Sequence, residues 1–428
     1  MKILSACALV LCALHAQTSR SDLLNEPAGK EPVLAPLLSV HDPASVRFFS
    51  VGRVRSTIGI GWSCTASLVA GSDTPDPHKP ALLVTAGHCA AGLTGDNEVV
   101  TDRPMGEGWF FIPSYFYDNK DQHVRIPIAR VLYSTMKSTD LGVLELGETY
   151  GEVLAKGFKP LRLRALDGAT PDIDIAHVPL GLFPDHYLRY SECPSRAPVA
   201  LYETLRKHEV RPDVPWFWPR ANPNNCIGLY GGSSGAPIFA RGTWEIIGVH
   251  STGLREPGCG WSKPCEIEAG QPVARLDTSY FAAVDRVVDA FKADGSFDPS
   301  GLEPGTGILL SRKGGGQGTD GRVAGERRPV RWGMLIDESF ESVRYKIGFA
   351  DETHCEQAKG YGAAEAVLQQ PLLDLATPSA PGFYVMCAVG KRPGSEQWQP
   401  WAQATIKLLR VEPPAGPGSP ADSSPPAE

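Results

Sequence analysis

Three short motifs, widely separated in the chain, carry residue types that can cooperate in acyl transfer. They read TAGHC at residues 85–89, TDLGVL at 139–144 and GGSSGAP at 231–237. A serine hydroxyl attacks a carbonyl efficiently when an imidazole takes its proton and a carboxylate holds that imidazole in the right tautomer. The motifs supply these groups as His88, Asp140 and Ser234. They therefore predict hydrolysis by a serine nucleophile.

The glycines around Ser234 suit the same chemistry. Backbone N–H groups must be aimed at the negative charge that develops on the attacked oxygen, and glycine allows the tight backbone that presents them. Each motif is weak by itself, because a glycine-serine string is often a loop and a lone histidine or aspartate is often structural. Their order along one chain, each in its own context, is what favours a catalytic site.

On these motifs, residues 47–292 resemble the chymotrypsin-like (trypsin-fold) serine protease family. TAGHC matches the family's histidine motif, DLGVLEL its aspartate strand and GSSGAP its G-x-S-G-x-P nucleophile motif. The segment GVHSTG at 248–253 matches the strand that pairs with the substrate backbone. The spacings, 52 residues from His88 to Asp140 and 94 from Asp140 to Ser234, also suit the family.

The resemblance implies a role for each residue. Ser234 is the nucleophile, His88 is the general base and later the general acid, and Asp140 orients His88. The backbone N–H groups of Gly232 and Ser234 are expected to form the oxyanion hole. The resemblance thus implies a serine endopeptidase that cleaves protein or peptide substrates, with no cofactor and no metal.

The resemblance also indicates substrate-binding positions. The pocket floor lies six residues before the nucleophile, at Gly228, which brings no carboxylate to pair with a basic substrate side chain. Ser251 and Gly253 belong to the substrate-pairing strand, and His250 stands where glutamate-specific relatives place a pocket histidine. An imidazole there could hydrogen-bond a substrate carboxylate, or carry a full charge below about pH 6.5. The alternative is a packed strand histidine with no part in specificity.

One departure from the family concerns activation. Many secreted members have an aspartate immediately before the nucleophile, where it pairs with a new N-terminus after cleavage, but this chain has Ser233. It also lacks a convincing Ile-Val-Gly-Gly activation site near Val51. The chain therefore resembles the bacterial-type branch of the family, and other bonds must hold the oxyanion hole.

The segments that must position these residues have the pattern of short strands. Runs such as RFFSVGRV, ALLVTAG, LGVLEL and WEIIGVHS recur between residues 47 and 291, separated by glycine, proline and aspartate. Many strands without interleaved helices indicate an antiparallel barrel or sandwich. Apolar residues at helical spacing predict one helix over 279–291. Together with the resemblance, this gives an all-β fold class, with two six-stranded antiparallel β-barrels and a C-terminal helix.

Changes of composition divide the chain into domains. We expect a signal peptide at 1–16, a leader or pro-segment at 17–45 and a trypsin-like protease domain at 46–295. Further along we expect a glycine-rich linker at 296–328, a small immunoglobulin-like β-sandwich at 329–411 and a disordered Pro/Ser-rich tail at 412–428. In the sandwich, Tyr384 of the GFY motif resembles the tyrosine corner of such domains.

The N-terminus and the cysteines indicate export. Residues 3–14 are almost continuously apolar, too short to span a bilayer but suited to a secretory signal, with a lipid-attachment box at Cys7 as the alternative. An even number of cysteines in an oxidising compartment favours disulfides, and eight remain beyond the signal: Cys64, Cys89, Cys193, Cys226, Cys259, Cys265, Cys355 and Cys387. Their grouping predicts one local bridge, two in the middle cluster and one in a separate domain. The resemblance suggests Cys64–Cys89 as the local bridge.

Composition excludes several other classes of protein. The 42% hydrophobic and 21% charged content is that of a globular protein. A net charge of −7, from 41 basic and 48 acidic residues, argues against nucleic-acid binding. No later stretch suits a membrane span, so we expect a secreted monomer, extracellular or periplasmic. The rival function is an idle trypsin-fold scaffold that binds or adheres through its C-terminal sandwich, because a fold alone does not establish activity.

Overall fold

The computed structural model describes residues 33–411, except for 58–62, 93–94, 96, 167, 169–170, 181–185, 205–214, 261, 303–310, 313–330, 336–339, 368–371 and 377. The predicted signal peptide, the first part of the leader, most of the linker and the tail therefore lie outside the described residues. The chain forms two compact units. The first holds the described residues up to 204, with 217–266 and 274–302, and the second holds residues 215–216 and 267–273 with the C-terminal region.

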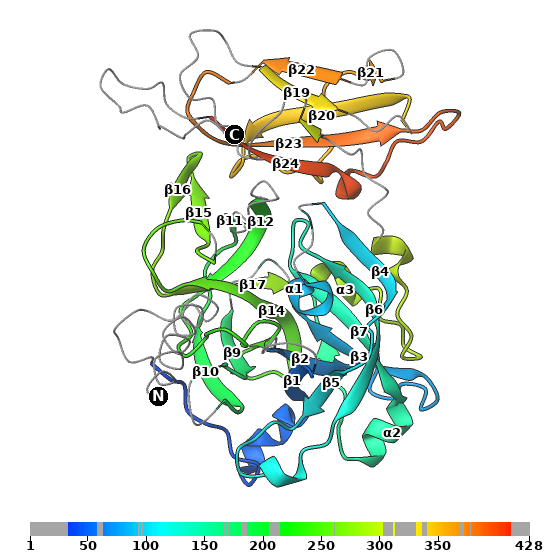
Figure 1. Cartoon of the computed structure of the whole chain (residues 1–428), viewed down its shortest axis with the longest axis vertical. Coiled ribbons are helices and arrows are strands. Elements are labelled where there is room, and N and C mark those ends of the chain that lie inside the picture. Colours follow the sequence, from blue (N-terminus) through cyan, green and yellow to red (C-terminus); the bar gives the residue numbers. More distant parts are fainter. Residues whose placement is uncertain are drawn as a thin grey trace, which may run out of the picture. The chain divides into compact units, whose positions relative to one another are not determined.

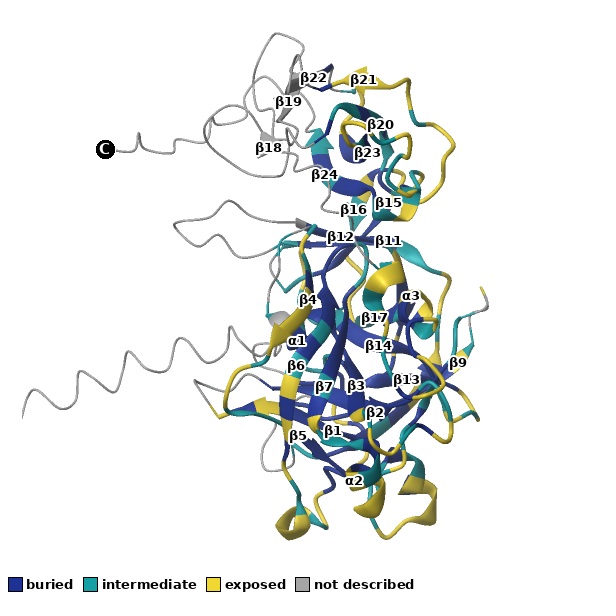
Figure 2. Ribbon diagram, turned by 90° about the vertical axis from the view of Figure 1, so that its right-hand side faces the viewer, coloured by how far each residue is buried: buried dark blue, intermediate teal, exposed yellow. Residues whose placement is uncertain are grey.

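The first sheet of the first unit closes into a barrel. Its strands are β1 (Val51–Ser56), β2 (Ser63–Val69), β3 (Pro80–Thr85), β4 (Val99–Pro104), β5 (Trp109–Pro113), β6 (Ile126–Thr135) and β7 (Leu141–Thr149). They pair in the order β4-β6-β5-β1-β2-β3-β7, and β6 also pairs with β7, so six of the strands form a closed ring. Apolar residues of these strands belong to one buried core, and Figure 2 shows β2 and β3 buried along most of their length.

The second sheet is built from the strands that follow. They are β8 (Arg162–Leu163), β9 (Asp172–His177), β10 (Arg189–Pro194), β11 (Val199–Thr204), β12 (Pro215–Asn224), β13 (Pro237–Ala240), β14 (Glu245–Leu254), β15 (Cys265–Glu268), β16 (Gln271–Val273) and β17 (Thr278–Ala283). The order is β10-β9-β13-β14-β17-β12-β11-β15-β16, with β8 parallel to β14. Ser195, just beyond β10, forms a bridge with Asn224 at the end of β12. This bridge links the two ends of the six-strand series from β10 to β12.

These two sheets lie side by side (Figure 1) and share a core. Val84 and Val143 of the first sheet and Phe239 and Val249 of the second are all fully buried in it. The all-β prediction of a trypsin-like pair of barrels is thus confirmed. Helical elements are short: η1 (Pro43–Phe48), α1 (Gly87–Ala91), η2 (Lys120–Gln122), α2 (Tyr150–Ala155), α3 (Asp285–Val288), η3 (Pro299–Leu302) and η4 (Trp401–Gln403). Within the described residues no helix is long and apolar enough to cross a membrane.

The helix predicted over 279–291 is wrong for most of its length. Residues Thr278–Ala283 form strand β17, and only Asp285–Val288 are α-helical. Phe281 pairs with Asn222 on one side and with His250 on the other, which makes β17 an interior strand. Because both faces of this strand are covered, adjacent apolar residues are both buried, and this run imitates the spacing of a helix.

Four disulfides match the predicted grouping of the cysteines. The local bridge is Cys64–Cys89, the middle cluster holds Cys193–Cys226 and Cys259–Cys265, and the separate domain holds Cys355–Cys387. The sequence left the pairing of the middle four cysteines open. It is decided by the fold, which places Cys193 at the end of β10 beside Cys226 at the end of β12.

The C-terminal unit contains two small sheets. One has the order β18 (Ser311–Arg312), β19 (Arg331–Leu335), β22 (Leu372–Ala376), and the other the order β21 (Glu365–Ala366), β20 (Ser342–Phe349), β23 (Gly382–Lys391), β24 (Thr405–Val411). Leu375 of the first packs in one core with Met386 of the second, as in a sandwich. The Tyr384 hydroxyl donates to the carbonyl of Ala380 at 2.8 Å, the bond of a tyrosine corner. Strand β18 and helix η3 both fall within the segment predicted as linker.

Candidate active site

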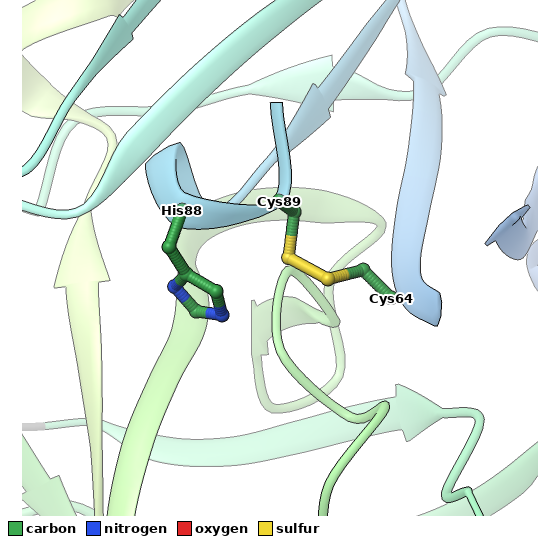
Figure 3. A group of neighbouring side chains, drawn as sticks. All are labelled: Cys64, His88 and Cys89. Atoms are coloured by element: carbon green, nitrogen blue, oxygen red, sulfur yellow. A yellow bond between two sulfur atoms is a disulfide. The ribbon is translucent and has the colours of Figure 1, made fainter. Parts of the chain in front are cut away.

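The residue His88 is held in place by the close contacts of its neighbours. It lies on α1, directly after β3, and Cys89 ties this helix to β2 through the disulfide with Cys64 (Figure 3). A Cβ on Gly87 would lie 2.1 Å from the carbonyl oxygen of Thr135, so only glycine allows the helix to approach β6 this closely. The Ser134 hydroxyl then donates to the Gly87 carbonyl at 2.7 Å. The TAGHC motif is therefore a packing requirement as well as a source of imidazole.

Asp140 is buried against His88. Its carboxylate accepts hydrogen bonds from the backbone N–H of His88 at 3.0 Å and from the His88 Nδ1 at 2.8 Å. The Ser251 hydroxyl donates to the same carboxylate at 2.6 Å. Burial alone would raise the pKa of Asp140, but His88 and these hydrogen bonds outweigh it and hold the pKa below its ordinary value. An ionised Asp140 keeps the proton on Nδ1, which leaves Nε2 of His88 free to accept one.

The same contacts raise the pKa of His88, whereas they lower that of Asp140. Burial lowers the pKa of His88, but the charge of Asp140 and the hydrogen bond to it raise it by more, with a smaller contribution from Glu203. The net result is a pKa above 6.5. The imidazolium that forms when His88 takes a proton is thus stabilised by its surroundings.

Ser234 is joined to this pair through Ser251. Its hydroxyl donates to the Ser251 carbonyl at 3.4 Å, and its own carbonyl accepts from the Thr65 N–H at 2.8 Å. The next residue, Gly235, has φ +82°, and a Cβ there would lie 2.0 Å from the Thr85 hydroxyl oxygen. Both the backbone conformation and the space therefore require glycine after the serine. The nucleophile motif and the histidine motif meet at this contact.

The loop before Ser234 is held by hydrogen bonds to neighbouring segments. The N–H of Leu180 donates to the Gly231 carbonyl at 2.5 Å, and the Thr65 hydroxyl donates to the Gly232 carbonyl at 3.0 Å. In a trans peptide the C=O and the following N–H point in opposite directions. The bond to Gly231 therefore aims the N–H of Gly232 away from Leu180. Gly232 itself has φ +89°, a conformation that favours glycine.

Ser233 shows what occupies the position of the usual aspartate. It is fully buried, and its hydroxyl lies 3.0 Å from Nδ1 of the equally buried His177 on β9. The hydroxyl oxygen also accepts the N–H of Tyr230 at 3.3 Å. Burial, followed by the charges of Arg189 and Arg255, lowers the pKa of His177 to about 3. His177 is therefore neutral, and a neutral buried hydrogen bond takes the place of an ion pair.

The predicted substrate-binding residues lie in two different surroundings. Gly228 faces the N-terminal segment, because a Cβ there would lie 2.6 Å from the backbone nitrogen of Ala35. The Ser251 hydroxyl is hydrogen-bonded to the Asp140 carboxylate. A Cβ on Gly253 would lie 3.3 Å from Nη2 of Arg255. Residues 35–38, which fall in the predicted leader, therefore pack against β10 and against Gly228, the predicted pocket floor.

His250 is buried, and its neighbourhood is positively charged. Burial, followed by the charge of Arg255, lowers the pKa of His250 to about 3. Its Nδ1 has no hydrogen-bond partner among the described residues. The expected full charge below about pH 6.5 is therefore not available to His250, which can offer only a neutral hydrogen bond.

Two charged residues near the site were missed from sequence. Glu203 on β11 is 8% exposed, and burial raises its pKa to about 7, although Thr252 and Ser262 hydrogen-bond to it. Arg255 directly follows β14. Neither residue stands in a recognisable motif. Glu203 is positioned by β11, and the sequence does not predict that β11 pairs with β15. Only the position of Arg255, two residues after the GVHSTG segment, could have drawn attention to it.

His88, Cys64 and Cys89 also form the one group of metal-ligand types found among the described residues (Figure 3). The two sulfurs are joined at 1.99 Å in a disulfide, so neither is the thiolate that a metal would need. The grouping reflects the bridge that anchors α1.

Comparisons with known proteins add a likeness of fold. No family model matches the chain, and no curated protein matches it. Among solved structures it is similar to the protease Anisep from Arthrobacter nicotinovorans, with 15% identity and a TM-score of 0.35 over 55% of this chain and 90% of that one. It is also similar to the thermostable serine protease AL20 from an extremophilic microorganism, with 14% identity and a TM-score of 0.33 over 56% of this chain and 92% of that one. A protein named HBP is similar with 12% identity and a TM-score of 0.35 over 59% of this chain and 92% of that one. Likenesses this distant carry no activity to this chain.

Proposed function

We propose that the chain is a secreted serine endopeptidase that hydrolyses peptide bonds through an acyl-enzyme intermediate. The observation that carries the proposal is the chain of contacts around one carboxylate. Asp140 accepts hydrogen bonds from the backbone N–H and Nδ1 of His88 and from the Ser251 hydroxyl. The carbonyl of Ser251 in turn accepts a hydrogen bond from the Ser234 hydroxyl. A scaffold protein has no need for a buried carboxylate that orients an imidazole and is linked through Ser251 to a serine in a glycine-rich motif.

In this proposal Ser234 attacks the substrate carbonyl, and Nε2 of His88 removes the hydroxyl proton. The ionised Asp140 holds the Nδ1–H tautomer and stabilises the imidazolium that results. The imidazolium then gives its proton to the leaving amine, and water repeats the sequence to release the acid. The N–H groups of Gly232 and Ser234 stabilise the negative oxygen at each tetrahedral stage.

Labelling by a fluorophosphonate probe tests the proposal directly. The folded full chain should react at Ser234, as located by peptide mass spectrometry, and a Ser234→Ala variant should not react. The buried Ser50→Ala variant, which loses a hydroxyl bonded to the Lys159 carbonyl away from the site, is the matched control and should label normally. Absence of labelling in the folded wild type would favour the rival scaffold function.

Secretion is part of the same proposal. Four disulfides in a chain of this size fit an oxidising compartment outside the cytosol. Cleavage of the N-terminal signal, a monomeric state and the bacterial-type branch stay predictions from the sequence. N-terminal sequencing of exported protein and light scattering would test the first two.

The acid limb of the pH–rate profile should lie above pH 6.5. His88 must be neutral to accept the proton, and its pKa is raised, so kcat/KM falls as the pH drops through that raised value. Glu203, whose own pKa is raised to about 7, contributes to the raise when it is ionised, so Glu203→Gln should move the midpoint slightly to lower pH. Glu245→Gln, which removes an equal charge from an exposed pair with Arg164, is the control. An unmoved midpoint in Glu203→Gln would contradict the coupling.

Ser233→Ala should lower kcat by about 10- to 100-fold with little change in KM. The change removes the hydrogen bond to His177 and loosens the loop that aims the Gly232 N–H, whereas complete loss of one oxyanion donor costs roughly 100- to 1,000-fold. His177→Asn, which keeps a hydrogen-bonding atom close to the position of Nδ1, should retain more activity than His177→Ala. Steady-state kinetics beside thermal melting separate positioning from stability: a lower melting temperature with unchanged kcat would mean a purely structural bond.

A further inference from the structure

Arg255 lies where three segments of the second sheet meet. Its Nε and Nη2 both donate to the Leu229 carbonyl, at 3.3 and 3.0 Å, and Nη2 also donates to the Ser279 hydroxyl at 2.5 Å. Its Nη1 makes two long bonds, at 3.3 Å to the Leu254 carbonyl and 3.4 Å to the Thr278 carbonyl. Every acceptor is neutral.

The guanidinium therefore keeps an uncompensated charge. No carboxylate among the described residues comes within ion-pair distance of it, whereas Arg241 and Arg196 nearby in the same unit are paired. The negative charge of Asp277 acts on Arg255 only through space. Arg255 is half-buried, where a cation without an ionic partner is costly, and an arginine stays charged at any pH that enzymes meet. Its N–H donors are all accepted by neutral groups, so among the described residues the guanidinium lacks only a negatively charged partner.

Its position relates this charge to the candidate substrate pocket. Leu229, which accepts two of its hydrogen bonds, directly follows Gly228. On the other side, a Cβ on Gly253 would lie 3.3 Å from its Nη2. The guanidinium thus lies between the segment that leads to the nucleophile and the segment predicted to pair with the substrate backbone.

The histidines of this region cannot carry the charge. His250 and His177 both have pKa values lowered to about 3, and the positive charge of Arg255 is among the causes in each case. Arg255 holds the charge and the histidines stay neutral around it. Tyr230, Asp277 and Tyr280 are the other titratable groups that act on Arg255.

We propose that Arg255 is the specificity-determining residue of the pocket and selects a substrate with an acidic side chain, glutamate or aspartate, immediately before the scissile bond. This rests on the proposed peptidase function. The substrate carboxylate takes over the Nη1 donors, whose bonds to the Leu254 and Thr278 carbonyls are long, at 3.3 and 3.4 Å. It gains charge-assisted hydrogen bonds, while a lysine or arginine in its place is repelled.

The test compares kcat/KM for matched peptides with Glu, Gln, Leu or Arg before the scissile bond. We expect the wild type to prefer Glu over Gln by about 10- to 100-fold, in line with a charge-assisted hydrogen bond. Arg255→Gln should bring this ratio close to one, and Arg255→Lys should retain much of it. Both kcat/KM values are measured on one protein sample, so a smaller folded fraction lowers both equally and leaves their ratio unchanged.

The pH dependence separates Arg255 from His250. The Glu/Gln ratio should stay flat from about pH 6 to 9, because the guanidinium does not titrate there, whereas a charged histidine would lose it above about pH 7. His250→Ala should keep the ratio. A ratio that survives Arg255→Gln, or that His250→Ala abolishes, would overturn the proposal.

Binding measured without turnover keeps this test distinct from that of the proposed function. In a Ser234→Ala background, calorimetry with the uncleaved Glu and Gln peptides should show the same preference, and Arg255→Gln should remove it. A wild type that cleaves nothing but still binds Glu peptides through Arg255 would sink the peptidase proposal and leave the acidic site standing. Equal binding of both peptides would overturn the acidic site itself.

Discussion

Replacing Ser234 by alanine is expected to lower kcat by about 10⁴-fold or more, with KM changed far less. The hydroxyl supplies the attacking oxygen, and nothing in its surroundings can replace it. Its neighbours would stay in place, because the backbone bonds of Ser234 to Thr65 and of Gly235 to the His250 carbonyl do not involve the side chain. The measurement is turnover of a peptide substrate, with protein folding checked by circular dichroism.

The control for this experiment is the buried Ser50→Ala variant, which should keep wild-type kcat. Active-site titration of the wild type excludes a contaminating protease as the source of activity. A Ser234→Ala protein with normal peptidase activity would mean that another group attacks the substrate. The assignment of the nucleophile would then be wrong, whatever the fold.

Asp140→Asn is expected to cost about 10⁴-fold in kcat near neutral pH. In the wild type one carboxylate oxygen accepts from both the His88 Nδ1 and the Ser251 hydroxyl. An asparagine that turned its NH₂ group toward them would offer donors to donors and favour the tautomer with Nδ1 unprotonated. Nε2 would then carry the proton and could not take one from Ser234.

The Ser251→Ala variant provides the matched comparison. It removes only one of the three hydrogen bonds to Asp140 and leaves the carboxylate ionised, so its loss of kcat should be far smaller. The pH profile offers a second readout, since the raised pKa of His88 depends chiefly on Asp140 and should fall in Asp140→Asn. Equal kinetics of Asp140→Asn and wild type would remove Asp140 from the mechanism.

The candidate site was accessible from the sequence because each of its steric conditions demands one residue type at one position beside a functional residue. Gly87 and Gly235 are required by contacts of 2.1 and 2.0 Å with neighbouring segments, so each leaves a recognisable glycine beside the functional residue. Likewise, the grouping of the cysteines followed from their positions along the chain. Where residues must satisfy a short-range steric condition, the requirement is written into a motif.

The strand β17 shows where local pattern misleads. Its apolar residues fit helical spacing, yet Phe281 pairs with Asn222 and His250 in the interior of a sheet. The competing sheet partners come from about 30 and 60 residues away in the chain. Hydrogen bonds and burial supplied at that distance override the spacing that a short window detects.

By itself the sequence determined the all-β class and the order of His88, Asp140 and Ser234. It also showed that neither position 228 nor position 233 carries a carboxylate. Only the tertiary structure places a charged group, Arg255, beside Gly253 and Leu229, near the predicted substrate-binding residues. His250 stood in the expected motif, but burial beside Arg255 keeps it neutral. Arg255 stood in no motif and gained its position from carbonyls on three separate segments. Charge and desolvation depend on everything within several ångströms, and that neighbourhood exists only once the chain has folded.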